Sequence, residues 1–126
     1  MGEYIETYKE LSPLKLIQGG SLRINTSYID RVGSTDTPAD ISEYECWFVL
    51  CPWGQPNYVQ LRKQCALVSG TAHTMSVLIT SAESKGLQGG SYVFEFVLKD
   101  INSQYIKNAE GLINIKGSNC DYIGGA

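Results

Sequence analysis

The stretch SYVFEFVLK, Ser91–Lys99, decides the fold class. Four bulky apolar residues occupy alternate positions in it: Tyr92, Phe94, Phe96 and Leu98. The polar residues Ser91, Glu95 and Lys99 occupy odd-numbered positions and would point to the opposite side. A strand gathers alternate side chains on one face, whereas a helix would scatter these aromatics around its circumference. The stretch therefore predicts a β-strand with an apolar face.

The same alternation recurs in both directions from this strand. Leu22, Ile24, Thr26 and Tyr28 share one side of SLRINTSYI, and shorter apolar patterns follow at Val59 and Leu61, at Met75, Val77 and Ile79, and at Ile113 and Ile115. Glycine, proline and aspartate separate these segments, as in VGSTDTPAD, and KDINSQ resembles a hairpin connection between Leu98 and Tyr105. We expect an all-β protein, an immunoglobulin-like antiparallel β-sandwich of about seven or eight short strands.

Helix is expected in two places only. YIETYKEL, residues 4–11, is predicted to make a turn or two, and TSAESKGL, residues 80–87, one turn before Gly89 and Gly90. The expected domain boundaries are an N-terminal arm at 1–17, a sandwich domain at 18–117 and a C-terminal tail at 118–126.

Composition narrows the range of partners. The chain has 126 residues, enough for one domain with one core, and its formal net charge is −3 without any basic run. Binding to a phosphate backbone requires a surplus of lysine and arginine, so no nucleic-acid partner is expected. The longest apolar run, CWFVLCPW, is too short to cross a bilayer, so we expect a soluble protein made in a cytoplasm, with no membrane partner.

No constellation in the sequence is typical of an enzyme or a metal site. The single histidine, His73, has no nucleophile motif near it, and the cysteines form no Cys-x-x-Cys pair. Cys46 and Cys51 are an odd number of residues apart, so in a strand they face opposite sides and pair poorly in a disulfide. Asp30, Asp36 and Asp40 are interpreted as turn formers. We therefore predict no catalytic residues, no metal and no cofactor.

Trp53 stands apart from these structural residues. Pro52, Gly54 and Pro56 flank it, so it is expected in a turn. Two interpretations remain open: Trp53, with Tyr58, is an exposed anchor for a protein partner or a sugar ring, or Trp53 folds back to cap the open end of the sandwich.

Three segments together resemble a known family. The first is GGSLRINTSYIDRVGSTDTPADISEYECWFVL, in which the matching positions are Pro38, Asp40, Ile41, Ser42 and Tyr44. The second is LQGGSYVFEFVLKD, through Leu87, Gly90, Tyr92, Phe94 and Phe96, and the third is AEGLINIKG, through Glu110, Gly111, Ile113 and Ile115. This order of features resembles the amino-terminal domain of the phage baseplate upper protein and related virion β-sandwiches. The resemblance covers about residues 18–117; Glu43 departs from it, standing where the family often has glycine.

The resemblance implies a non-enzymatic structural protein of a tailed bacteriophage virion, made in the host bacterial cytoplasm. Such a small adaptor would mount a fibre or baseplate component, or decorate the capsid. Its partners would be other tail, fibre or capsid subunits, with a homo-oligomer in the particle. The resemblance also sets the phase of Glu43–Gly54: Cys46, Phe48 and Leu50 inward, Trp47, Val49 and Cys51 outward. The alternative hypothesis is a carbohydrate-binding or adhesion module with Trp47, Trp53 and Tyr58 as stacking platforms.

The first seventeen residues carry more apolar bulk than a free tail should. We expect the arm to pack on a neighbouring subunit by strand addition or in a groove, unless it completes the domain's own sheet. The residues predicted to contact partners are Tyr4, Ile5, Tyr8, Leu11, Leu14, Trp47, Val49, Trp53 and Tyr58.

Overall fold

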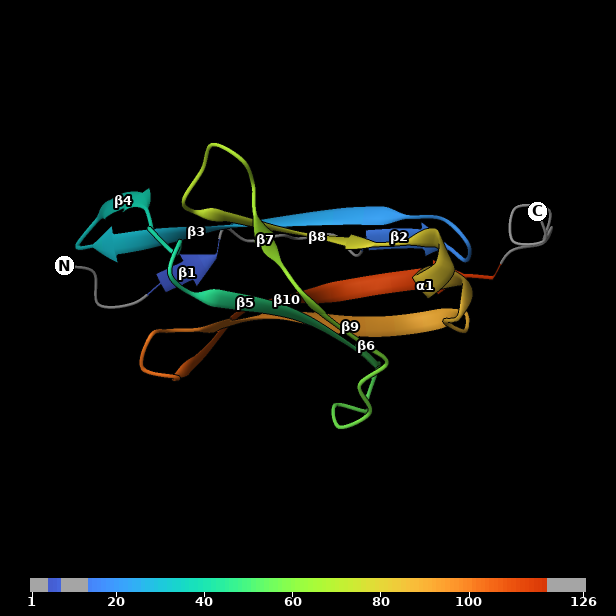
Figure 1. Cartoon of the computed structure of the whole chain (residues 1–126). Helices are drawn as coiled ribbons and strands as arrows, with labels where there is room; N and C mark the ends of the chain where they lie inside the picture. The colour runs from blue at the N-terminus through green and yellow to red at the C-terminus, as the bar shows by residue number, and fades with distance from the viewer. Residues whose placement is uncertain (1–4, 8–13, 118–126) are drawn as a thin grey trace.

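The computed structural model describes residues 5–7 and 14–117, and these form two packed β-sheets (Figure 1). The first sheet has the order β1 (Ile5–Thr7), β3 (Leu22–Val32), β8 (Thr74–Ile79) and β7 (Ala66–Leu67), with β4 (Thr35–Pro38) also paired to β3. The second has the order β2 (Leu14–Ile17), β10 (Tyr105–Lys116), β9 (Gly90–Lys99), β5 (Glu45–Pro52) and β6 (Leu61–Gln64). The predicted all-β sandwich is confirmed, with ten strands in the described residues rather than seven or eight. The additional strands are edge segments of two to four residues, too short to show an alternation.

The core lies between the sheets and is built by the predicted alternations. Tyr28, Phe48, Phe96 and Leu98 are completely or almost completely buried, as are Ile79 and Ile113. The rings of Phe48, Phe94 and Phe96 form a triangle with centroids 5.5 to 5.9 Å apart. Gly111 of β10 lies under Phe94: a Cβ there would come within 2.6 Å of the ring. The aromatic cluster therefore needs glycine at this position, because any larger residue would displace Phe94.

Strand β5 has the predicted phase. Cys46, Phe48 and Leu50 are buried between the sheets, whereas Trp47, Val49 and Cys51 lie on the outer face and are half-buried. Cys46 continues the β5–β6 register to Cys65, whose N–H donates to the Cys46 carbonyl at 2.8 Å. Cys65 is the single residue between β6 and β7, where the chain passes from one sheet to the other.

The N-terminal segment contributes to both sheets. Ile5–Thr7 pairs antiparallel with β3, and Leu14–Ile17 pairs parallel with β10. The prediction of helix at 4–11 is wrong for residues 5–7, because the edge of β3 offers this segment backbone partners that outweigh its local preference. The rest of that segment, including Tyr4, Tyr8 and Leu11, lies outside the described residues, as does the tail at 118–126.

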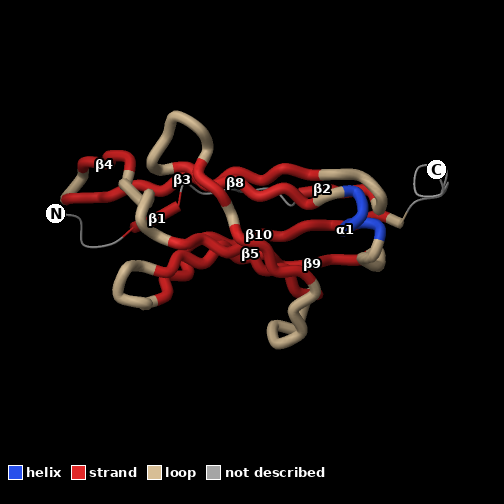
Figure 2. The backbone as a smooth tube through the Cα atoms, viewed as in Figure 1, coloured by secondary structure: helices blue, strands red, loops and turns tan. Residues whose placement is uncertain are grey.

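The second helix prediction is confirmed. Helix α1 (Ser81–Lys85) sits at one end of the sandwich and is the one blue segment in Figure 2. Thr80 caps it: its side chain accepts from the Glu83 N–H, and the Glu83 carboxylate accepts from the Thr80 N–H. The hairpin between β9 and β10 is confirmed at residues 100–104, where Ser103 adopts a positive φ of 62°. The expectation for Val59 is wrong: it lies in a loop, 49% exposed.

Candidate functional site

The loop from Trp53 to Gln60, between β5 and β6, contributes residues to two hollows on the surface. It projects from the second sheet on the side away from the first sheet (Figure 1). Backbone hydrogen bonds fold it back on itself: the Gln55 N–H donates to the Pro52 carbonyl, and the Tyr58 N–H to the Gln55 carbonyl, both at 3.0 Å. Pro52, at the base of the loop, lines two hollows, one apolar and one polar.

The apolar hollow measures about 400 Å³ on the outer face of the second sheet. Its lining comes from β5, from β9 and from the loop: Val49, Cys51, Pro52, Gly54, Pro56, Asn57, Val59, Val93, Glu95 and Val97. The register places Val49 opposite Glu95 and Cys51 opposite Val93, so neighbouring strands present these side chains together. Alternation along each strand produces this surface, because inward aromatics require the intervening residues to point outward.

Cys51 connects the loop to the sheet inside this hollow. Its thiol donates to the Pro56 carbonyl, with Sγ and O 3.5 Å apart. Burial raises the pKa of the Cys51 thiol, and the nearby Glu95 carboxylate adds to that effect. The thiol is therefore mostly protonated at neutral pH and serves as an apolar contact with one weak hydrogen bond.

Trp47 lies beside the hollow and does not present a bare face. The Arg62 guanidinium carbon stands 4.4 Å from the Trp47 ring centroid, and the indole N–H donates to Glu45 at 3.3 Å. Trp47, Val49, Cys51, Val93, Val97 and, by register, Leu112 of β10 form what we name the apolar outer face. Apolar side chains predominate in the hollow, and charged residues on the same face of the sheet are Glu95, Glu110 opposite it on β10, and Arg62 opposite Val49.

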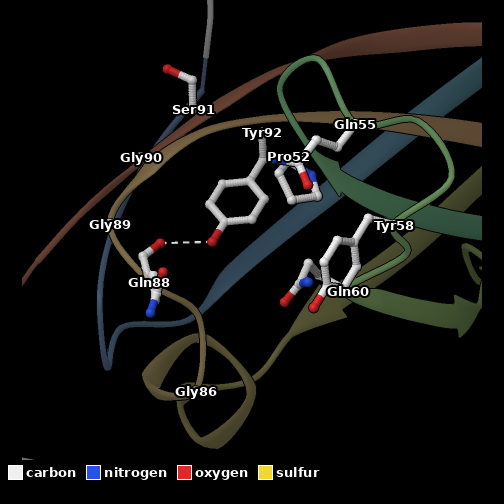
Figure 3. Close-up of a pocket in the computed structure, with 10 residues that line it drawn as sticks. All are labelled: Pro52, Gln55, Tyr58, Gln60, Gly86, Gln88, Gly89, Gly90, Ser91 and Tyr92. Atoms are coloured by element: carbon white, nitrogen blue, oxygen red, sulfur yellow. Dashed lines mark hydrogen bonds between the residues drawn. The ribbon is translucent and has the colours of Figure 1, made fainter.

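The polar hollow lies on the other side of Pro52 and measures about 430 Å³ (Figure 3). The loop, the segment after α1 and the start of β9 line it: Pro52, Gln55, Tyr58, Gln60, Gly86, Gln88, Gly89, Gly90, Ser91 and Tyr92. The Tyr92 hydroxyl donates to the Gln88 carbonyl at 2.7 Å, and this hydrogen bond holds the Tyr92 ring in place along one side of the hollow. Tyr58 forms the facing, solvent-exposed side. None of the lining side chains carries a formal charge at neutral pH.

The residues predicted to contact partners do not lie together in one site. Val49 lines the apolar hollow and Tyr58 the polar hollow, while Trp47 and Trp53 line neither. Trp53 is 65% exposed, which disfavours the interpretation that it folds back as a cap, and its role as an anchor stays a prediction. Ile5 and Leu14 lie in strands of the domain's own sheets. The three glutamines of the polar hollow were missed, because only the folded loop brings Gln55 and Gln60 to Gln88.

Three groups with titratable protons meet in the core beneath β5. The Tyr28 hydroxyl and the Cys46 sulfur are 3.8 Å apart, and Cys65 lies opposite Cys46. Burial raises the pKa of Tyr28, and the hydrogen bond with Cys46 together with burial raises that of Cys65. Cys46, Cys51 and Cys65 are all free thiols. Both buried cysteines act as small apolar residues.

His73 and the aspartates have local structural roles. The His73 carbonyl accepts from the Tyr28 N–H at 2.8 Å, immediately before β8. Asp40 accepts from the Ser42 N–H and hydroxyl at 3.0 and 2.6 Å, and these hydrogen bonds lower the pKa of its carboxyl. Within residues 5–7 and 14–117, no three His, Cys, Asp or Glu side chains gather closely enough to hold a metal ion. In the same residues, no helix has the length and apolar character needed to span a bilayer.

Comparison by sequence yields no relative: no family model matches the chain, and no curated protein matches it. Comparison by structure yields sandwiches. CopC from Methylosinus trichosporium OB3b shares 9% identity over 86% of this chain and 90% of that chain, with a TM-score of 0.47. A fibronectin(III)-like module of Clostridium thermocellum CbhA shares 11% identity over 90% and 96%, with a TM-score of 0.41. Murine CRIg shares 10% identity over 92% and 99%, with a TM-score of 0.46. With TM-scores below 0.5, these likenesses carry no further conclusion, and the assignment of a β-sandwich rests on the two packed sheets described above.

Proposed function

We propose that this chain is a non-enzymatic structural protein of a tailed bacteriophage virion, a small adaptor that docks on another virion subunit. The observation that supports the proposal most is the apolar outer face with its 400 Å³ hollow. Its docking partner would be a fibre, baseplate or capsid subunit that inserts apolar side chains into the hollow. The resemblance of residues 18–117 to phage virion sandwiches supplies the class of partner.

The apolar outer face has the composition of a surface that is covered in an assembly. Trp47, Val49 and Val93 stand outward on adjacent strands, beside the exposed Val59. Contiguous apolar surface rimmed by polar residues marks interaction sites in soluble proteins, and each square ångström of it removed from water contributes about 25 cal/mol. Arg62 and Glu45, which hold the Trp47 ring, would form part of the polar rim.

The role of the N-terminal arm changes with the structure. Because Ile5–Thr7 and Leu14–Ile17 pair with β3 and β10, their backbone groups serve the domain's own sheets. The alternative that the arm completes its own domain therefore describes these seven residues. Docking by the sheet face does not require them to leave their sheets.

Particles of the phage that encodes the chain provide the test. Mass spectrometry of density-purified virions is expected to find the chain at a fixed copy number, and a particle map is expected to place its apolar outer face against another subunit. A Val59→Lys variant is expected to reduce the copy number about tenfold, because the lysine would leave a charge in an apolar interface.

Ile101→Lys is the matched control. Ile101 is 72% exposed in the β9–β10 hairpin, outside both hollows, so the same substitution there is expected to leave the copy number unchanged. Purified particles that lack the chain would refute the virion role. Particles that contain both variants equally would refute docking through this face.

The alternative, a carbohydrate-binding module with Trp47, Trp53 and Tyr58 as one platform, has less support in that form. Arg62 covers one face of Trp47, and Tyr58 lines a hollow that neither tryptophan reaches. The three rings therefore do not form a common stacking surface. Only Tyr58 has polar groups arranged beside it.

A further inference from the structure

We propose that the polar hollow binds a neutral saccharide, stacked on Tyr58 and held by the side-chain amides of the glutamines around it. This site goes beyond the adaptor role, because it lies across Pro52 from the apolar hollow and shares only that residue with it. Its volume of about 430 Å³ falls in the range of roughly 300–1,000 Å³ typical of small-ligand sites.

The hydrogen-bonding groups of the hollow are those that match sugar hydroxyls. Gln55, Gln60 and Gln88 each bring a side-chain amide, which has one acceptor oxygen and two donor hydrogens. These amides make no hydrogen bond to another described residue. A sugar hydroxyl both donates and accepts, so each amide could pair with adjacent hydroxyls in either sense.

Tyr58 supplies the apolar contact that such a ligand needs. Its side chain is 60% exposed, and its ring faces the hollow opposite Tyr92 (Figure 3). An aromatic ring offers a flat apolar face with a polar hydroxyl at its end, which suits the C–H face of a pyranose ring. The hydrogen bond from Tyr92 to the Gln88 carbonyl keeps the opposite wall in place.

The charge of the lining selects between ligand classes. No Asp, Glu, Lys, Arg or His lines the hollow, so a phosphate or carboxylate would lose its hydration without gaining an ion pair. Nucleotides and acidic sugars are thereby disfavoured. An extended peptide would need a free strand edge, but the Ser91 carbonyl at this site already accepts from the Trp53 N–H at 3.0 Å.

Protein NMR on the whole chain tests the proposal directly. The probes are the neutral disaccharides maltose, cellobiose, lactose and N,N′-diacetylchitobiose, and the anionic digalacturonate. At least one neutral disaccharide is expected to shift the backbone amide signals of residues 86–91 in a saturable manner. Digalacturonate is expected to bind at least tenfold more weakly.

Two tyrosine variants locate the binding on Tyr58. Tyr58→Ala is expected to weaken the best disaccharide about tenfold or more, while Tyr58→Phe, which keeps the stacking face, retains most of the affinity. Tyr105→Ala is the matched control, because Tyr105 is 63% exposed but lies at the distant β9–β10 hairpin. Its affinity is expected to equal that of the unsubstituted chain.

Several results would overturn the saccharide site. These are no signal change at residues 86–91 with any neutral disaccharide, equal binding of digalacturonate, or an equal loss in Tyr58→Ala and Tyr105→Ala. Binding of an unstructured peptide at these signals, in place of the sugars, would also overturn it. Because the measurement uses isolated protein, its failure is distinguishable from absence of the chain in virions.

Discussion

The outer faces of the two sheets differ in the polarity of their side chains and in the hydrogen bonds that these side chains make. On the first sheet, Arg23 donates to the Ser76 hydroxyl at 2.9 Å, and the hydroxyls of Ser27 and Thr74 are also 2.9 Å apart. Polar side chains on that face form hydrogen bonds between neighbouring strands, as expected for a face in contact with water. On the second sheet, the apolar outer face presents Val49, Val93 and a hollow instead.

This difference shows that the same alternating pattern can serve two purposes. Both sheets need alternate apolar residues toward the core, but the intervening positions are free to be polar or apolar. Polar residues there indicate a solvated face, whereas apolar residues indicate a face with a partner. The apolar positions of the second sheet are the reason that the proposed docking is placed there.

Thiol reactivity is expected to separate the two sides of the second sheet most strongly. In a Cys120→Ser background, Cys51 on the outer face is expected to react with a disulfide reagent far faster than Cys46 and Cys65, which must wait for the domain to open. With a typical stability of at least 5 kcal/mol, the rate ratio is on the order of 10³ or more. Because the pKa of Cys51 is raised, its rate is expected to keep increasing above pH 9. Equal rates for the three thiols in folded protein would contradict the assigned faces.

Core and outer-face truncations are expected to differ in stability. Phe96→Ala removes a ring that is 1% exposed and packed on two other phenylalanines, so a loss of about 3–5 kcal/mol is expected in urea unfolding. Val49→Ala, on the half-buried outer face, is expected to cost about 1 kcal/mol or less. A Val49 loss as large as that of Phe96 would mean that the outer face is core, not docking surface.

Gly111→Ala tests the close approach of β10 to the aromatic cluster. The added methyl group would lie 2.6 Å from the Phe94 ring, so the ring must move, at an expected cost of about 1–3 kcal/mol. Glu110→Ala, at the exposed neighbouring position, is the control and is expected to change the free energy of unfolding little. An unchanged melting temperature for Gly111→Ala would show that the inner face tolerates more volume than its packing indicates.

The contacts that Lys63 makes with Glu83 and Leu78 at the edge of the two sheets are here called the clamp. Substitutions around it are expected to change the free energy of unfolding by an intermediate amount. Lys63 of β6 binds Glu83 of α1 at 2.9 Å and also donates to the carbonyl of Leu78 in β8, so it joins the layers outside the core. Thr80→Ala removes the helix cap and is expected to cost about 1 kcal/mol in thermal or urea unfolding. Ser81→Ala, at an exposed position in the same turn, is the control.

The pH dependence of stability that arises from the Glu83 carboxyl provides a second test of this clamp. Burial works to raise the pKa of its carboxyl, but the hydrogen bonds from Thr80 and Lys63 outweigh it, and the pKa is lowered from 4.5. A lowered folded-state pKa adds stability that is present above pH 4.5 and is lost as the pH falls through the folded value. At pH 7 the unsubstituted chain is expected to have a larger free energy of unfolding than Glu83→Gln. This difference is expected to shrink as the pH is lowered. A difference that grew on acidification would contradict the clamp.

The smallest expected effect concerns Arg62. Arg62→Ala removes the cation from the Trp47 ring, and a loss of about 0.5–1 kcal/mol is expected by chemical denaturation. Arg62→Lys is expected to recover part of it. Trp47 fluorescence is expected to shift in Arg62→Ala; an unshifted spectrum would mean that the guanidinium does not cover the ring in solution.

The sequence predicted those parts of the fold that depend on alternation. In β3 and β9 the period-two pattern identified the inward residues, because one face of each strand must be buried, whereas in β5 the phase was set by the family resemblance. Whether the N-terminal arm pairs with its own domain's sheets or docks on a neighbour was left open, because that pairing depends on the free edges of β3 and β10, which lie elsewhere in the sequence. Local pattern carries no information about such edges.

The candidate sites were predictable only in part. Tyr58 and Val49 were identified because aromatic and apolar residues at outward positions are unusual. The glutamines of the polar hollow were not, because a glutamine in a loop is ordinary until the fold of that loop brings it to another segment. Gln60 and Gln88, for example, line the same hollow although they are 28 positions apart in the sequence.

The parallel pairing of β2 with β10 has a mechanical consequence. Ile17 lies opposite Lys116 and Leu14 opposite Ile113, so the chain enters this pair at one end and leaves it at the other. A pull along the strands between these two points would strain all the hydrogen bonds of the pair together in shear, rather than opening them one after another. In single-molecule stretching we expect one abrupt rupture at high force, and gradual extension at low force would contradict it. A protein that joins two parts of a particle would resist tension through this pair.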